Sequence, residues 1–147
     1  MVSKCKLDLG LVVDRTQSIK YKNIPKLKAA LEHLVQRFDI SEDETHVSFS
    51  TFAKRARLHN TFNNPAYYNV DAIQDLIDSS FSRLRRPTRL DRAVKLAKEQ
   101  MFTDRNGLRG SVRNVLVLYT DGRSHPRDTE MYYLDLVALK VSRQPFV

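Results

Sequence analysis

The sequence has little cysteine and no long apolar run. A single cysteine, Cys5, has no partner for an internal disulfide, and no Cys/His cluster of the kind that binds zinc is present. No stretch approaches the ~18 consecutive apolar residues that a membrane-spanning helix needs. The first ten residues, MVSKCKLDLG, also lack the charged-then-apolar profile of a signal peptide, which taken alone favours a cytosolic protein.

The motifs of several common enzyme classes are missing as well. There is no Gly-rich phosphate loop, no nucleophile elbow with a Ser-His-Asp set, and no Asp-x-Asp pair after the first apolar run. An aspartate at a strand end could serve phosphoryl transfer with Mg²⁺, but the matching lysine motif is lacking. We therefore expect that the protein is not an enzyme.

Positive charge is in excess. The 147 residues include 25 Lys and Arg against 17 Asp and Glu, which gives a formal net charge of +8. Part of the excess is local, because one short segment holds a single aspartate, Asp91, and five arginines: Arg83, Arg85, Arg86, Arg89 and Arg92. Such a segment is either a solvated face or a positive field that draws acidic partners. No helix-turn-helix, zinc finger or aromatic RNA-binding motif supports a nucleic-acid partner.

The 147 residues fit a single domain, and the 41% that are hydrophobic suffice for a sizeable core. The predicted strands and helices give this domain the α/β class. Apolar runs predict strands at residues 7–13, 46–52, 55–62 and 112–119, the second with one buried face because polar and apolar residues alternate. Helical spacing predicts helices at residues 24–38, 70–77, 88–101 and 129–141. The short link between the second and third strands predicts a hairpin with an antiparallel edge strand.

Oxygen-bearing side chains follow two of the apolar strands. The first strand ends in Asp14, with hydroxyls at Thr16 and Ser18, and the run VRNVLVLYTDG ends in Asp121. In an open parallel sheet the ligand crevice lies outside the carboxyl ends of the strands. Thr88, in RRPTRLDRAV, opens a predicted helix and is either its cap alone or both its cap and a further ligand. We prefer the ligand interpretation, and the set predicts a site for a hard cation.

This arrangement resembles the metal-ion-dependent adhesion site of the von Willebrand factor A domain family. The family pattern is Asp-x-Ser-x-Ser after the first strand, a lone Thr before a mid-domain helix, and an Asp in a Thr-Asp-Gly turn. The matching residues here are Asp14, Thr16, Ser18, Thr88 and Asp121. Thr16 replaces the usual Ser, Arg15 lies between ligands, and residues 85–87 read Arg-Arg-Pro where small glycines are usual.

The resemblance implies a fold and a cofactor. The fold is a Rossmann-like open sheet, mostly parallel with one antiparallel edge strand and with helices on both faces. Residues 1–147 would form one such domain, without its last strand or strands and its closing helix. The cofactor is Mg²⁺ or Mn²⁺, held by Thr16, Ser18 and Thr88 directly or nearly so, and by Asp14 and Asp121 partly through water.

The resemblance also implies a function and a class of partner. A Glu or Asp of a protein partner, such as collagen or another matrix protein, would complete the metal shell. Four basic residues are expected to assist partner binding: Arg15, Arg89, Arg92 and Arg123. The basic surface could also attract an acidic polysaccharide.

The expected setting is the extracellular matrix or cell adhesion, as in the matrilin, collagen VI and invertebrate matrix branches of the family. Extracellular members commonly pair a cysteine before the first strand with one beyond the last helix, so Cys5 is a free thiol, an intermolecular partner or half of a bridge to a missing segment. The alternative is an intracellular domain of this type that acts as an assembly scaffold.

Overall fold

A computed structural model describes residues 6–120 of the chain. The predicted helix at 129–141 and the positions of Cys5, Asp121 and Arg123 lie outside the described residues. The regular elements follow one another as β1 (Leu7–Asp14), α1 (Ile24–Val35), β2 (Thr45–Phe52), β3 (Ala56–Leu58), α2 (Val70–Ser79), α3 (Leu90–Leu96) and β4 (Arg113–Tyr119). Short 3₁₀ turns connect several of them.

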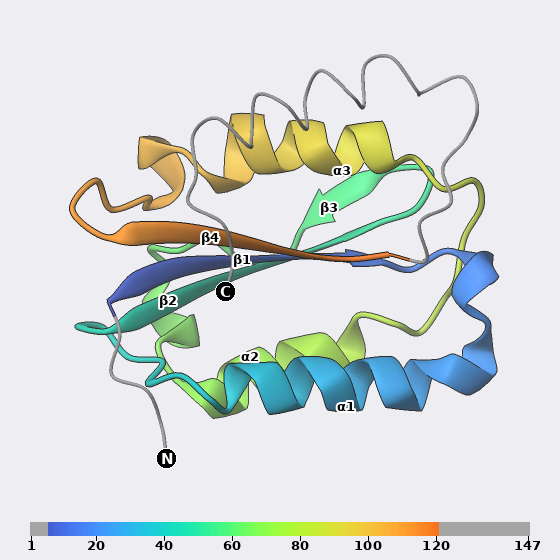
Figure 1. Cartoon of the computed structure of the whole chain (residues 1–147), viewed down its shortest axis with the longest axis horizontal. Coiled ribbons are helices and arrows are strands. Elements are labelled where there is room, and N and C mark those ends of the chain that lie inside the picture. The colour runs from blue at the N-terminus through green and yellow to red at the C-terminus, as the bar shows by residue number, and fades with distance from the viewer. Residues whose placement is uncertain (1–5, 121–147) are drawn as a thin grey trace.

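The strands form one mixed sheet in the order β3-β2-β1-β4. β1 pairs in parallel with both β2 and β4, whereas β3 pairs antiparallel with β2. Helices α1 and α2 cover one face of the sheet and α3 covers the other (Figure 1). The predicted α/β class, with a mostly parallel sheet, one antiparallel strand and helices on both faces, is confirmed. The carboxyl ends of β1, β2 and β4 therefore meet along one edge of the sheet.

Alternate residues of β1 contribute to two separate cores. Leu7, Leu9, Leu11 and Val13 pack in the cluster that includes α1 and α2, while Val12 packs in the cluster under α3. On the α3 side a Cβ atom added at Gly10 would lie 2.6 Å from Sδ of the fully buried Met101. The glycine thus lets the end of the helical segment approach β1 closely.

β2 differs from its prediction. Its alternating sequence predicted one buried face, but all eight residues are buried, including the polar residues on the second face. The hydroxyl of Ser48 donates to the carbonyl of Asn60 at 2.8 Å, and that of Ser50 donates to the carbonyl of Leu11 at 3.2 Å. The prediction of one buried face was wrong because β2 is a central strand, and its buried hydroxyls are hydrogen-bonded within the protein.

Two helices are shorter than predicted. α1 ends at Val35, three residues before the predicted end at 38. α3 begins at Leu90 with Arg89 as its N-cap and no side-chain cap hydrogen bond, so the interpretation of Thr88 as the helix cap was wrong. The helical path then continues as a π-helical turn, Ala97–Met101. Within the residues described, no helix combines the length and apolar character needed to cross a membrane.

Candidate metal centre

Asp14 is the last residue of β1 and is fully buried. Its Oδ1 accepts a hydrogen bond from the backbone N–H of Thr16 at 2.8 Å, and its Oδ2 accepts one from the hydroxyl of Thr120 at 3.2 Å. Sequence analysis missed Thr120, although it directly precedes Asp121 in the YTDG turn. The two hydrogen bonds fix the carboxylate where the ends of β1 and β4 meet.

The loop after β1 pairs with the loop before α3. Thr16 and Arg85 form an isolated parallel β-bridge. Across it, the backbone N–H of Gln17 donates to the carbonyl of Arg85 at 2.9 Å, and the N–H of Arg85 donates to the carbonyl of Arg15 at 3.1 Å. This pairing holds two loops that are about seventy residues apart in the sequence side by side.

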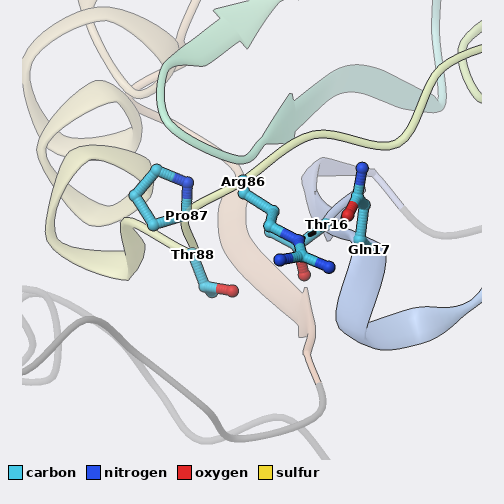
Figure 2. Close-up of a pocket in the computed structure, with 5 residues that line it drawn as sticks. All are labelled: Thr16, Gln17, Arg86, Pro87 and Thr88. Atoms are coloured by element: carbon cyan, nitrogen blue, oxygen red, sulfur yellow. Dashed lines mark hydrogen bonds between the residues drawn. The ribbon is translucent and has the colours of Figure 1, made fainter.

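Thr16 and Thr88 line one pocket as a result. Its volume is about 340 Å³, and its remaining walls are Gln17, Arg86 and Pro87. Figure 2 shows the hydroxyl of Thr88 directed away from Pro87 into the open space of this pocket. Thr88 is partly buried, and Thr16 is almost fully buried at 2% exposure.

The donors in this region suit a hard cation. Asp14, Thr16 and Thr88 offer only oxygen, the element that Mg²⁺ and Mn²⁺ prefer. The side chain of Ser18 is not described, although its backbone lies in the 3₁₀ turn Gln17–Ile19, and Asp121 lies beyond the described residues. Residues 6–120 contain no group of three or more His, Cys, Asp or Glu side chains arranged for a metal. The described donors fit Mg²⁺ or Mn²⁺ better than a metal that prefers nitrogen or sulfur.

Arg86 makes this pocket unusually positive. Its guanidinium reaches across the front of Thr16 and its Nε donates to Oε1 of Gln17 (Figure 2). A positive charge therefore lines the same pocket as Thr16 and Thr88, the two hydroxyls that would bind a cation.

The four predicted partner-binding arginines have different surroundings. Arg89 forms two hydrogen bonds with the carboxylate of Asp91, at 3.0 and 2.9 Å. Burial acts to raise the pKa of Asp91, but hydrogen bonds and the charge of Arg89 outweigh it and lower that pKa. Arg92 is exposed and its Nη1 donates to the carbonyl of Lys54 at 2.7 Å. Arg15 lines a second pocket next to the first, and Arg123 lies beyond the described residues.

That second pocket is basic and includes residues that sequence analysis did not single out. Its volume is about 370 Å³ and it is lined by Arg15, Ala53, Lys54, Arg55, Arg85 and Arg86. Lys54 and Arg55 lie in the loop between β2 and β3, far in sequence from the arginine-rich segment. A signal was available, because that loop follows the carboxyl end of a parallel strand adjacent to β1.

Comparisons with known proteins agree with this fold and these motifs. Matrilin-3 of Gallus gallus is 25% identical over 125 residues, which cover 83% of this chain and 26% of the relative. Integrin alpha-1 of Gallus gallus is 28% identical over 127 residues, which cover 84% of this chain and 43% of the relative. The chain thus spans less than half the length of these relatives.

A solved structure and a family profile extend the comparison. Proximal thread matrix protein 1 of the mussel byssus, solved with a zinc-occupied MIDAS motif, superposes with a TM-score of 0.77 at 23% identity, over 93% of this chain and 34% of its own. The sequence profile described as von Willebrand factor type A domain matches residues 8–143. With β1 ending in the Asp-x-Thr-x-Ser motif and the sheet in the order β3-β2-β1-β4, this match identifies the chain as a member of the von Willebrand factor type A domain family.

Proposed function

We propose that this domain is a divalent-cation-dependent protein-binding module. The cation is Mg²⁺ or Mn²⁺, and its ligands are Asp14, Thr16, Ser18, Thr88 and Asp121. The observation that carries the proposal is the pocket shared by Thr16 and Thr88, beside a buried Asp14 whose two oxygens are held by hydrogen bonds. The module has no catalytic role in this proposal.

The ligand types explain why the bound ion would seek a partner. Hydroxyl ligands are neutral, so two carboxylates leave the charge of a divalent ion only just balanced at the site. An ion held in this way acts as a Lewis acid toward a further anionic oxygen. A glutamate or aspartate of the partner protein supplies that oxygen, and the basic surroundings increase the rate at which acidic partners arrive.

The proposed setting is the extracellular matrix or the cell surface. Matrilin-3, integrin alpha-1 and a byssal thread matrix protein are among the proteins that this chain resembles. By this likeness, collagen or another matrix protein carrying an exposed Glu or Asp is the partner class we propose. Acidic polysaccharide is a second class that the net charge of +8 supports.

Thermal unfolding in EDTA and then in millimolar Mg²⁺ or Mn²⁺ tests the metal directly. A ligand that binds only the native state stabilises it, by ~2.7 kcal/mol when the free ion is a hundredfold above its dissociation constant. We expect the wild type to gain stability and the Asp14→Asn and Thr88→Ala variants to lose that gain. Ser82→Ala, which removes an exposed hydroxyl elsewhere, is the matched control and should keep it. A cooperative transition that metal does not shift would refute the proposal.

A further inference from the structure

The basic pocket beside the candidate metal centre is assembled from three loops. Arg15 comes from the loop after β1, Lys54 and Arg55 from the loop after β2, and Arg85 and Arg86 from the loop before α3. Backbone hydrogen bonds join the loops: the N–H of Arg89 donates to the carbonyl of Ala53 at 2.9 Å, and that of Arg85 to the carbonyl of Arg15 at 3.1 Å. The pocket is therefore organised before any ligand arrives.

Its positive charges are not balanced by the described part of the protein. Within residues 6–120 no carboxylate forms an ion pair with any of its five basic side chains. The Asp91 carboxylate binds Arg89, and that of Asp14 accepts hydrogen bonds from Thr16 and Thr120.

Arg15 shows the electrostatic consequence. Its Nε is buried and has no hydrogen-bond partner among the described residues. Burial lowers the pKa of its guanidinium, and the charges of Arg85 and Arg57 lower it further. A guanidinium in this position is stabilised by an anion, because an anion supplies both a hydrogen-bond acceptor and a compensating charge.

The basic pocket and the metal pocket share a wall. Arg86 lines both pockets, so only its side chain would separate an anion in the metal pocket from an anion in the basic pocket. We propose that the partner presents two acidic residues, of which one completes the metal shell and the other enters the basic pocket formed by Arg15, Lys54, Arg55 and Arg85. This inference rests on the proposed metal-dependent binding and specifies the partner that it selects.

The dimensions favour an acidic peptide segment over a sugar chain. In an extended peptide, residues i and i+2 point to the same side and are about 7 Å apart, roughly the reach of one arginine side chain. A Glu-x-Glu or Asp-x-Glu segment can therefore place one carboxylate on each side of Arg86. The basic pocket, at about 370 Å³, has room for one such side chain with its hydration water. The guanidinium forks of Arg55 and Arg85 match a planar carboxylate.

Two synthetic peptides test this arrangement. One contains a single Glu among glycines and the other contains Glu-Gly-Glu, and binding of each is followed by fluorescence anisotropy in 2 mM Mg²⁺ at low and at physiological salt. We expect the two-acid peptide to bind about tenfold more tightly, with the difference shrinking as salt rises. The double variant Arg55→Ser with Arg85→Ser should remove this gain and leave single-acid binding and the Mg²⁺-induced stabilisation intact. Lys95→Ser with Arg105→Ser removes two exposed charges elsewhere and should preserve the gain.

Three outcomes would overturn the inference, and they are distinguishable. If the two peptides bind with equal affinity and Mg²⁺ still stabilises the protein, recognition of a second acidic residue is refuted and the proposed function is not. If Mg²⁺ does not change the thermal stability of the wild type, both the proposed metal-dependent function and the recognition of two acidic residues are refuted. The third outcome combines two results: a heparin oligosaccharide binds in EDTA and this binding is lost only in the Arg55/Arg85 variant, and the two-acid peptide binds no more tightly than the single-acid peptide. This outcome would assign the pocket to polysaccharide.

Discussion

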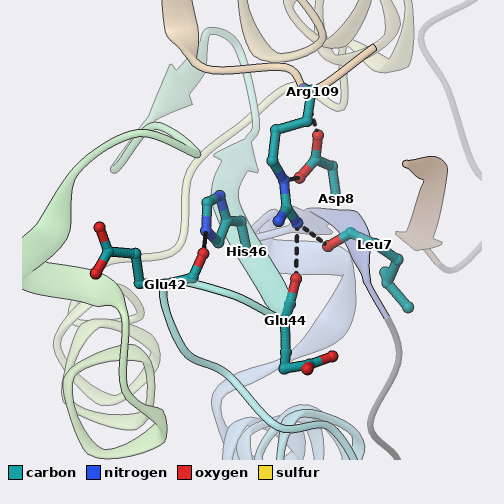
Figure 3. A network of polar contacts seen from close by, with 6 residues as sticks. All are labelled: Leu7, Asp8, Glu42, Glu44, His46 and Arg109. Atoms are coloured by element: carbon teal, nitrogen blue, oxygen red, sulfur yellow. Dashed lines mark hydrogen bonds and ion pairs between the residues drawn. The ribbon is translucent and has the colours of Figure 1, made fainter. Parts of the chain in front are cut away.

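The charged groups at the amino end of β1 are paired within the protein, whereas those near its carboxyl end are mostly of one sign. At the amino end Asp8 is fully buried and accepts hydrogen bonds from the backbone N–H and from Nε of Arg109, at 2.7 and 2.9 Å. The same arginine donates through Nη2 to the carbonyls of Leu7 and Glu44, at 2.9 and 2.8 Å (Figure 3). At the carboxyl end, five cations line one pocket without any carboxylate from residues 6–120. The charges at the first end are paired within the protein, and the cations at the second end are those that we propose bind an acidic partner.

Two histidines follow the same contrast. His46, at the amino end, donates from Nε2 to the carbonyl of Glu42 at 2.8 Å and stacks on Tyr68 with ring centroids 4.4 Å apart. Burial and the charge of Arg109 lower its pKa, and the Glu42 carbonyl and the charges of Asp8 and Glu42 offset only part of that decrease. His59 lies near the basic end, where burial and the charges of Arg57 and Arg15 all lower its pKa, to about 4.

Removing Arg109 should produce the largest loss of stability. Arg109→Ala leaves the buried carboxylate of Asp8 with only a backbone hydrogen bond, so we expect the free energy of unfolding to fall by about 3 kcal/mol, at the low end of the range for broken buried ion pairs. Urea denaturation measures this, with Arg105→Ala in the same loop as the control because its side chain is exposed. A loss no greater than that of the control would show that the ion pair contributes little.

The Asp8–Arg109 pair also shows what sequence reasoning cannot reach. Its members are 101 residues apart, and neither stands in a recognisable motif. Asp14, by contrast, ends an apolar run, so its position at a strand end was predictable from local pattern alone. The parallel central strands and the antiparallel hairpin were predictable for the same reason, but the predicted length of the third strand was wrong, because β3 covers only Ala56–Leu58 and not residues 55–62.

The errors arose where tertiary contacts override local pattern. The alternation of β2 suggested a solvated face, but every residue of this strand is buried, and the hydroxyls of Ser48 and Ser50 donate to the carbonyls of Asn60 and Leu11. Thr88 precedes a helix, as a cap does, yet the chain turns into α3 only after Arg89. Only part of the basic pocket was predictable from the sequence. Arg85 and Arg86 belong to a run of arginines, whereas Lys54 and Arg55 come from another loop.

Acidification should destabilise the basic end through His59. Its pKa is about 4 in the folded protein and 6.5 is the ordinary value, so the unfolded chain takes up the proton first as pH falls. Stability contributed by neutral His59 is therefore present above about pH 6.5 and is lost as pH falls from 6.5 toward 4. We expect a loss of about 1–2 kcal/mol by pH 5, after allowance for solvent screening.

Urea midpoints at pH 7, 6 and 5 measure this dependence. His59→Gln should flatten the curve, because glutamine does not titrate and keeps a group that can hydrogen-bond the hydroxyl of Thr51. His46→Gln should flatten it less, since the influences on the pKa of His46 partly cancel. Equal flattening by the two variants would contradict the contrast drawn between the two ends.

Arg86 should lower the affinity of the candidate metal centre. A nearby unit positive charge repels a divalent ion by an amount on the order of 1 kcal/mol in water before salt screening. Arg86→Ser should therefore lower the Mg²⁺ concentration at half-maximal thermal stabilisation by about two- to fivefold. The effect should be larger at 20 mM than at 300 mM NaCl. Arg83→Ser, which removes a charge from the same loop outside the pocket lining, should change it less. Unchanged metal affinity for Arg86→Ser would mean that its guanidinium does not act on the site.

The smallest effect should come from relieving repulsion among the basic side chains themselves. Arg85→Ser keeps the backbone pairing with Arg15 and Gln17 and removes one charge that faces Arg15. Because the side chain of Arg85 is exposed, we expect a gain of only a few tenths of a kcal/mol in unfolding free energy at low salt. Raising NaCl from 20 to 300 mM should stabilise the wild type by a similar amount and the variant by less, since screening weakens the same repulsion. Matched urea titrations at the two salt concentrations give both numbers. A variant less stable than the wild type at low salt would mean that Arg85 has a counter-charge in the protein, and the basic pocket would then not be free to select an acidic partner.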